Sequence, residues 1–325
     1  MSIENNIKHL ITHCGRLRKY ESLLIICDSK TLNIAKKFYL IGKKYTKKIL
    51  LIKNNKILKN HGEEPQKKIA NMRKKTDLII SLISSSIAHT QARKIASRHG
   101  SRFMSLPDYN KKVLSSKAIK INYLKKIKIC EKIKLKLDKS KKIHITSNKG
   151  TNLTLIVKNR IANSCPGILM NKGDLGSPPD VEVNITPVEN MTNGCLIVDG
   201  SVANKNVGIL KKNIKFEIKN GYIKNFYSEN SNYKRFLIKN FNNKKNYKKR
   251  RVLAELGIGL NHLAKLTGNM LTDEGSLGTI HFGFGSNDTI GGKNKVNFHL
   301  DFVIKKPNIY LDEKVCLIKN GKIQL

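Results

Sequence analysis

The feature that most constrains the fold is a regular alternation between short apolar runs and helix-like segments near the start of the chain. Runs rich in Leu and Ile, typical of buried strands, occupy 22–28, 48–53, 77–83 and a stretch that begins at Arg102. Segments with apolar residues at helical spacing lie between them, at 31–45, 66–75 and 89–98. Strands that alternate with helices in this way form a parallel sheet covered by helices. The sequence therefore predicts an N-terminal α/β domain.

The pattern changes in the second half of the chain. A basic, helix-like segment occupies 109–137, and short strand-like runs broken by Gly, Asn and Pro begin at Ile143. Within them Asp199-Gly200 is typical of a hairpin turn, and 228–251 is polar and basic, as in a surface helix or loop. We therefore predict an α/β domain over 1–138, followed by an α+β metal-binding domain over 139–325.

The net charge of +40 suggests nucleic acid as a partner, but the composition argues against it. The basic residues are mostly Lys and are spread over nearly every segment, with Asn and Ile also abundant, as A/T-rich codons would produce. Aromatic residues make up only 6% of the chain and Trp is absent, so stacking platforms for bases are scarce. We expect no specific nucleic-acid partner.

Other classes of protein are excluded by what the sequence lacks. No apolar run approaches the roughly 20 residues of a membrane span, and the first residues lack the apolar core of a signal peptide. The six cysteines are scattered without a CxxC pair, which argues against a disulfide framework. We expect a cytoplasmic protein with no membrane partner.

The stretch 255–301 carries the residues most suited to chemistry. His299 and Asp301 lie in an alternating apolar run over 296–304, and residues two apart in a strand project to the same face. His281 lies in a second short strand-like run at 278–282. Two imidazoles and a carboxylate that converge from strands suit zinc or a transition metal. The sequence predicts a metal site here, with an ordinary buried core histidine as the alternative for each imidazole.

The other acidic residues are harder to interpret. Glu255 is followed by Gly257 and Gly259, which favour a site-forming turn rather than a helix. Glu182 would be exposed on an ordinary strand, and its pattern alone does not select it. Asp273-Glu274 is more typical of a turn than of a metal ligand, and Ser84–Ser86 are typical of a helix N-cap, although parallel sheets also bind ligands at such strand ends.

Beyond these patterns, the chain resembles the aminopeptidase T family of metallo-aminopeptidases. It is especially similar to a shorter branch that also contains the non-haem iron enzyme 2,5-dihydroxypyridine dioxygenase. The similarity covers nearly the whole chain and is carried by 61–65 (HGEEP), 84–107, 181–201 and 255–301.

The resemblance implies a set of ligands and a reaction. The family's ligands for two divalent ions (zinc, cobalt or manganese) fall on Glu182, Glu255, His281, His299 and Asp301, with catalytic roles for the two glutamates. It also implies a small peptide substrate contacted by His89 and Arg93, and a homodimer. Two positions depart from the family pattern: Val181 stands where the family has Gly, and Asp288 stands where the peptidases have a catalytic Tyr.

Three functions remain open at this point. The main expectation is an aminopeptidase that removes N-terminal residues from peptides, because a site with one ion does not need Glu182 and Glu255. One Fe(II) held by His281, His299 and Asp301 would instead give a ring-cleaving dioxygenase. The third is a relative that keeps the ligands without catalysis.

Overall fold

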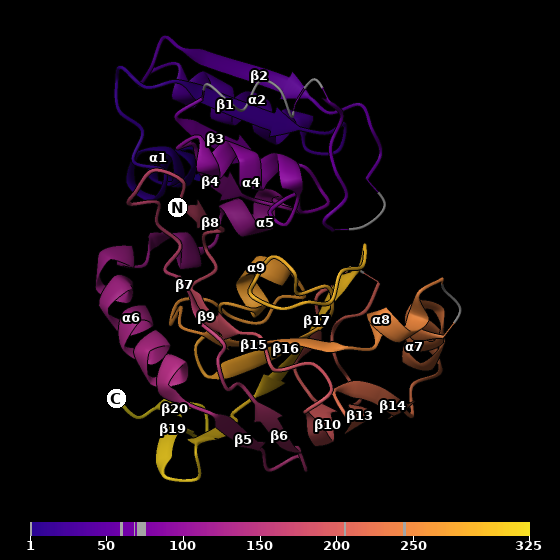
Figure 1. Ribbon diagram of the computed structural model, residues 1–325. Helices are drawn as coiled ribbons and strands as arrows, with labels where there is room; N and C mark the ends of the chain where they lie inside the picture. The colour runs from indigo at the N-terminus through magenta and orange to yellow at the C-terminus, as the bar shows by residue number, and fades with distance from the viewer. Residues whose placement is uncertain (1, 59–60, 68, 70–75, 205, 243–244) are drawn as a thin grey trace. The chain divides into compact units, whose positions relative to one another are not determined.

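The computed structural model describes residues 2–58, 61–67, 69, 76–204, 206–242 and 245–325 (Figure 1). The chain forms two compact units: unit 1 consists of Met1–Lys125 and Cys165–Val181, and unit 2 of Lys126–Ser164 and Glu182–Leu325. These limits differ from the predicted single boundary after residue 138, because the chain leaves unit 1 inside a helix and later returns to it for Cys165–Val181.

Unit 1 contains a parallel sheet, as the alternating pattern predicts. Among the described residues it has five strands in the order β2-β1-β3-β4-β8, and every neighbouring pair is parallel. The strands are β1 (Leu23–Cys27), β2 (Ile49–Lys53), β3 (Leu78–Ser81), β4 (Arg102–Ser105) and β8 (Leu175–Gly176). The central strands β1, β3 and β4 are buried throughout, as expected for a sheet covered on both faces.

Helices cover this sheet. In the described part of unit 1 they are α1 (Ile3–His9), the π-helix η1 (Leu10–Cys14), α2 (Leu32–Gly42), α4 (Gln91–Arg98), α5 (Lys111–Leu114) and the 3₁₀ helix η3 (Lys117–Lys120). The predicted helix over 66–75 falls largely outside the described residues. The N-cap of α4 is Thr90, whose side chain accepts from the backbone N–H of Arg93, so the expectation of an N-cap at Ser84–Ser86 is wrong.

The continuous helix predicted over 109–137 is also wrong. Its first part breaks into α5 and η3, and only α6 (Tyr123–Lys139) is long. Asn110 and Ser116 each accept a backbone N–H with their side chains, at the starts of α5 and η3. Short polar side chains that cap in this way start new helical turns, which the apolar spacing alone does not reveal.

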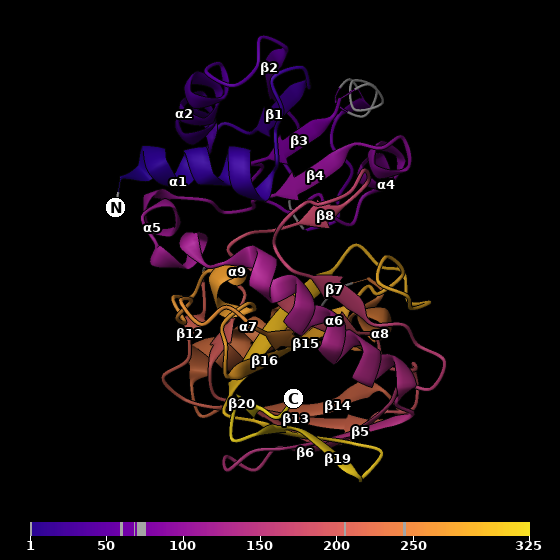
Figure 2. The same ribbon diagram turned by 90° about the vertical axis from the view of Figure 1, so that its left-hand side faces the viewer.

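Unit 2 is built on two antiparallel sheets, which lie in separate layers in both views (Figures 1 and 2). One has the order β14-β13-β10-β6-β5-β18-β19-β20 in the described residues. Its strands are β5 (Lys142–Thr146), β6 (Asn152–Ile156), β10 (Asn193–Val198), β13 (Ile214–Lys219), β14 (Tyr222–Tyr227), β18 (Asn308–Leu311), β19 (Val315–Lys319) and β20 (Lys322–Ile323).

The second sheet has the order β12-β11-β17-β16-β15-β9-β7, again counted over the described residues. Its strands are β7 (Asn163–Cys165), β9 (Glu182–Ile185), β11 (Ser201–Val202), β12 (Gly208–Ile209), β15 (Leu253–Gly259), β16 (Thr279–Gly285) and β17 (His299–Lys305). Asp199-Gly200 joins β10 in one sheet to β11 in the other, so the predicted hairpin turn is wrong. The α+β character predicted for this half of the chain is confirmed.

Aromatic side chains fill the core of unit 2. Phe216 of β13 lies 5.3 Å from Phe284 of β16 and 4.9 Å from Phe302 of β17, measured between ring centroids. Phe241, on α7 (Ser231–Phe241), lies 6.0 Å from Phe284. One face of β16 and β17 is therefore packed against the rest of unit 2, and their opposite face is left for other residues.

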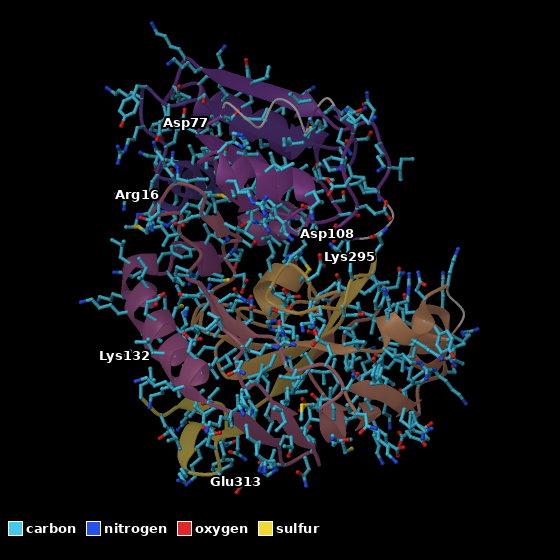
Figure 3. All side chains as sticks on the ribbon, in the orientation of Figure 1. Arg16, Asp77, Asp108, Lys132, Lys295 and Glu313 are labelled. Carbon is cyan, nitrogen blue, oxygen red and sulfur yellow. The ribbon has the colours of Figure 1, made fainter. Side chains whose placement is uncertain are left out.

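The remaining described helices of unit 2 are α8 (Tyr247–Arg250) and α9 (Met270–Asp273). No helix in the described part of the chain is both long and apolar enough to cross a lipid bilayer. Much of the positive charge lies on the surface, where Lys132 of α6 and Lys295 are exposed (Figure 3). All six cysteines lie in described segments and carry free thiols.

Candidate metal centre

Four neighbouring strands of the seven-stranded sheet carry the predicted site residues. Strands β9, β15, β16 and β17 form consecutive antiparallel pairs. Because alternate residues of a strand share a face, polar side chains from all four strands meet on the face opposite the aromatic core. The five side chains gathered there are Glu182, Glu255, His281, His299 and Asp301.

Each of the five lies across from a glycine on a neighbouring strand. The pairs are Gly259 with Glu182, Gly257 with His281, Gly283 with both Glu255 and Asp301, and Gly285 with His299. A Cβ on Gly257 would lie 2.0 Å from Cε1 of His281, and one on Gly283 would lie 2.5 Å from Nε2 of His299. Glycine is required at 257 and 283 because any side chain there would occupy the space of the imidazoles.

The five residues form two groups of three donors that share one carboxylate. In the first group, Nε2 of His281 lies 3.3 Å from Oε2 of Glu182 and 4.0 Å from Oε1 of Glu255. In the second, Nε2 of His299 lies 3.0 Å from Oε2 of Glu255 and 3.1 Å from Oδ1 of Asp301. Within each group the donor atoms all lie within 4.8 Å of one another. The two oxygens of Glu255 therefore face different imidazoles.

The centre is buried and acidic in a strongly basic protein. Glu182, Glu255 and Asp301 are each at most 7% exposed, and His281 is 1% exposed. In the described part of the chain, the ion pairs of the three carboxylates involve only the two imidazoles and no Lys or Arg. Buried carboxylates without cationic partners are costly unless a metal ion neutralises them.

Two buried polar atoms of the first group lack hydrogen-bond partners. They are Oε2 of Glu182 and Nδ1 of His281. In the second group, Nδ1 of His299 lies 2.8 Å from the carbonyl oxygen of Ser286 and donates to it, which leaves Nε2 facing the carboxylates. A metal-binding histidine is commonly oriented by such a bond to a backbone carbonyl.

The pKa values reflect this crowding of charge without a bound cation. Burial, followed by the nearby Glu255 carboxylate, raises the pKa of Glu182 to about 7 despite the opposing effect of His281. Burial would lower the pKa of His299, but Asp301 and Glu255 outweigh it and raise that pKa well above its ordinary value. Burial likewise opposes the effect of His299 on Asp301, yet the pKa of Asp301 is held below its usual range. The directions of these shifts indicate that positive charge is favoured at this buried centre.

These observations fit divalent metal ions. Imidazole nitrogens and carboxylate oxygens are the donors that zinc and other transition metals use. The Glu182 oxygen without a hydrogen-bond partner, the buried carboxylates that face imidazoles and the space left by Gly257 and Gly283 all point to the same centre. The five residues therefore have the donors and the space that a metal centre requires.

Two expectations for the glutamates need correction. Glu255 does not lie in a turn: it is in β15, where Gly257 and Gly259 alternate with Leu256 and Ile258, which are buried on the other face. Glu182 is buried rather than exposed, because both neighbours of β9 continue the sheet and its side chain points into the acidic cluster. The glycines that alternate along the chain after Glu255 are the sequence signal for a strand that leaves space for a site. The same spacing of glycines also occurs in turns, which is why the sequence favours a turn here.

Four further residues named from the sequence lie outside this cluster. His89 is exposed before α4 in unit 1, and the Nε–H of Arg93 donates to the carbonyl oxygen of Ala88. Their contact with substrate stays a prediction. Asp288 follows β16, and its Oδ1 accepts a hydrogen bond of 2.7 Å from Oγ of Ser286. Asp273, expected in a turn, is the last residue of α9, and its carboxylate accepts the backbone N–H groups of Thr267 and Gly268.

Comparison with known proteins now bears on this centre. The model of the 2,5-dihydroxypyridine 5,6-dioxygenase family matches residues 35–325. The chain belongs to this family. No curated protein sequence matches it. The structure of 2,5-dihydroxypyridine dioxygenase from Pseudomonas putida KT2440 is similar with a TM-score of 0.81 and 16% identity, over 99% of this chain and 96% of that one.

A second similar structure is that of AmpT. Wild-type AmpT from Thermus thermophilus is similar with a TM-score of 0.71 and 12% identity, over 99% of both chains. At these identities the likeness shows a common fold with both proteins. The chain thus shares its fold both with a dioxygenase and with AmpT.

Proposed function

We propose that this member of the dioxygenase family is a metal-dependent enzyme that binds two divalent ions and hydrolyses the N-terminal peptide bond of small peptides. The observation that carries the proposal is the position of Glu255, whose two oxygens face different imidazoles. A carboxylate shared in this way suits a pair of ions, and each ion would have one imidazole and two carboxylates as ligands.

The residues of the chain would have separate tasks in this reaction. Glu182, Glu255 and His281 would hold one ion, and Glu255, His299 and Asp301 the other. Bound divalent ions polarise a scissile carbonyl and lower the pKa of water. Oε2 of Glu182, buried and without a hydrogen-bond partner, is the oxygen available to bind an ion or to accept a proton. The carbonyl of Ser286 keeps Nε2 of His299 directed at the centre.

A second candidate is a ring-opening dioxygenase that uses one Fe(II). The family match over 35–325 and the higher TM-score of the Pseudomonas putida enzyme favour it over the peptidase. His281, His299 and Asp301 would supply two imidazoles and one carboxylate. However, neither group of three donors in the structure contains both imidazoles, and Glu255 stands between them. The comparisons thus favour ring opening, whereas the arrangement of the donors favours hydrolysis.

Metal content and activity measured on the same preparation separate the two candidates. We would purify the protein without chelators, measure metals per chain by elemental mass spectrometry, and assay it with aminoacyl-p-nitroanilides and with 2,5-dihydroxypyridine plus oxygen. Two equivalents of zinc, cobalt or manganese with peptidase activity are expected. One equivalent of iron with oxygen-dependent loss of the pyridine would replace hydrolysis by ring opening, and no metal after each ion is added back would refute both.

Variants of the shared carboxylate sharpen this test. Glu255→Ala should remove both ions and reduce activity to background, because both groups lose a donor, whereas Asp301→Ala should release mainly the ion of the second group. Glu217→Gln changes a partly exposed glutamate of β13 and is the matched control, expected to keep metal and activity. Light scattering of the same samples tests the homodimer that the family resemblance implies, which we keep as a proposal.

A further inference from the structure

A chain of amide side chains stands behind the first group of donors. Asn184 lies two residues after Glu182 in β9, on the same face of the strand, and is 5% exposed. Its Nδ2 donates to Oε1 of Glu182 over 2.7 Å. With Oε1 held in this way, Oε2 is the oxygen that faces His281. Asn184 therefore decides which oxygen of Glu182 is presented to the centre.

Asn184 is in turn oriented by Asn163 of β7, the neighbouring strand. Nδ2 of Asn163 donates to Oδ1 of Asn184 over 2.8 Å and to the carbonyl oxygen of Ile290 over 3.2 Å. Both partners are acceptors, so a rotated amide would bring Oδ1 of Asn163 against two oxygens. The orientation of Asn163 is thereby fixed, and it fixes the orientation of Asn184.

The second acceptor, Ile290, belongs to the loop between β16 and β17 (residues 286–298), which supports the other group of donors. The loop is closed on itself because the backbone N–H of Asn287 donates to the carbonyl of Asn294 over 2.9 Å, and the N–H of Asn294 returns a bond to Oδ1 of Asn287. At the start of the loop, the carbonyl of Ser286 holds Nδ1 of His299. A displaced Ile290 would therefore disturb the support of His299.

We propose that Asn163 is a positioning residue shared by both halves of the metal centre. It orients Glu182 of the first group through Asn184, and it holds the loop that orients His299 of the second group. The inference rests on the proposed metal centre, and it adds a residue that touches none of the five donors. If Asn163 had only a structural role, it would stabilise the loop without affecting how the centre binds metal.

Asn163 thus acts through two arms: its hydrogen bond to Asn184, which reaches Glu182, and its hydrogen bond to Ile290, which holds the loop. Variants of neighbouring residues test the two arms separately. Asn184→Ala removes only the arm that reaches Glu182. Thr186→Val removes a second hydrogen bond to the carbonyl of Ile290, 3.1 Å long, and does not touch Asn184. Asn163→Asp keeps the shape of the side chain but replaces the donor by an oxygen that faces two acceptors. Asn163→Ala removes both arms.

The measurements are Co²⁺ affinity by competition with a chelator, Co²⁺ stoichiometry, the visible spectrum of the Co²⁺-loaded protein and thermal unfolding of the metal-free protein. Residues behind metal ligands commonly change affinity by roughly 10–100-fold when they are replaced. We expect a loss in that range for both ions in Asn163→Ala and Asn163→Asp, with a changed spectrum. Asn184→Ala should weaken mainly the ion of the first group, and Thr186→Val, which loosens the same loop carbonyl, should weaken mainly the ion of the second group and by less than Asn163→Ala.

The outcomes are distinguishable. If the parent binds two ions and both Asn163 variants bind them with the parent's affinity and spectrum, the positioning role is refuted while the metal centre stands. Losses of affinity in Thr186→Val equal to those in Asn163→Ala would also refute it, because loop stability alone would then explain the effect. A parent that binds no metal would refute the centre, and the inference with it.

Discussion

Strand β1 in the parallel sheet of unit 1 and strand β15 in the seven-stranded sheet of unit 2 are both buried throughout, but they differ in what their two faces carry. In β1 of unit 1, all five residues from Leu23 to Cys27 are buried and apolar. In β15 of unit 2, all seven residues are also buried, but one face carries Leu253, Leu256 and Ile258, and the other Glu255 and two glycines. Burial alone therefore does not distinguish a core strand from a site strand. In β15 and β16 the distinguishing pattern is an acid or histidine followed by alternating glycines.

The largest expected effect comes from adding a side chain to the face of β15 and β16 that carries the glycines. Gly257→Ala should abolish metal binding about as completely as His281→Ala, because the new Cβ would lie 2.1 Å from Nε2 of His281. Gly283→Ala should do the same to the second group. Overpacking of this kind costs about 1–3 kcal/mol of stability. Metal stoichiometry after dialysis and thermal unfolding measure the two effects.

The matched change in unit 1 is Leu24→Ala, at a buried position of β1. It should cost about 2–5 kcal/mol of stability through the cavity that it creates. Metal stoichiometry of the folded fraction should nevertheless stay at the parent's value. Metal binding that survives Gly257→Ala, or that is lost in folded Leu24→Ala, would contradict the distinction between the two kinds of strand.

The two units should also respond oppositely to pH in the metal-free protein. Burial, then Lys120 and His13, lower the pKa of His9 in unit 1 to about 4, so its contribution to stability is present above pH 6.5 and is lost as the pH falls towards 4. The pKa of Glu182 is raised from 4.5 to about 7, so its contribution is present below pH 4.5 and is lost as the pH rises through 7.

Unfolding temperatures of the metal-free protein, measured between pH 4 and 8, test these two pH dependences of stability, which give one slope on the acid side and one near neutral pH. His9→Gln should flatten the acid side of the profile, and Glu182→Gln the neutral side. Saturating Zn²⁺ should also remove the neutral slope, because bound metal displaces the proton. A neutral slope that is unchanged in Glu182→Gln would assign it to other groups, and His299, whose pKa is also raised, is the next to be replaced.

The smallest expected effect is at a helix terminus of unit 1. Thr90→Ala removes the hydroxyl that caps α4 and should cost about 1 kcal/mol of stability, visible as a drop of a few degrees in the unfolding temperature. Metal affinity should not change. A change in Co²⁺ affinity in this variant would show that the metal centre depends on unit 1 more than its donors indicate.

The accuracy of the sequence predictions differed between the units for a physical reason. In unit 1, apolar runs and helical spacing are local properties that agree with the final structure, and β1, β2 and β3 fall inside the predicted runs. The helix over 109–137 was overestimated because caps at Asn110 and Ser116 outweigh the apolar spacing. The segment Cys165–Val181, which returns to unit 1, contributes one short strand that pairs with β4 and has no periodic signal.

The sequence by itself determined the parallel-sheet unit, the α+β character of the second half, and the strand that directs His299 and Asp301 to one face. These follow from periodicity and from the fixed geometry of a strand. Only the tertiary structure decided that Glu182 is buried, that Glu255 lies in a strand between two imidazoles, and that the glycines of β15 and β16 leave space for the site. Each depends on which strands become neighbours, and that choice is made by packing of residues far apart in the chain.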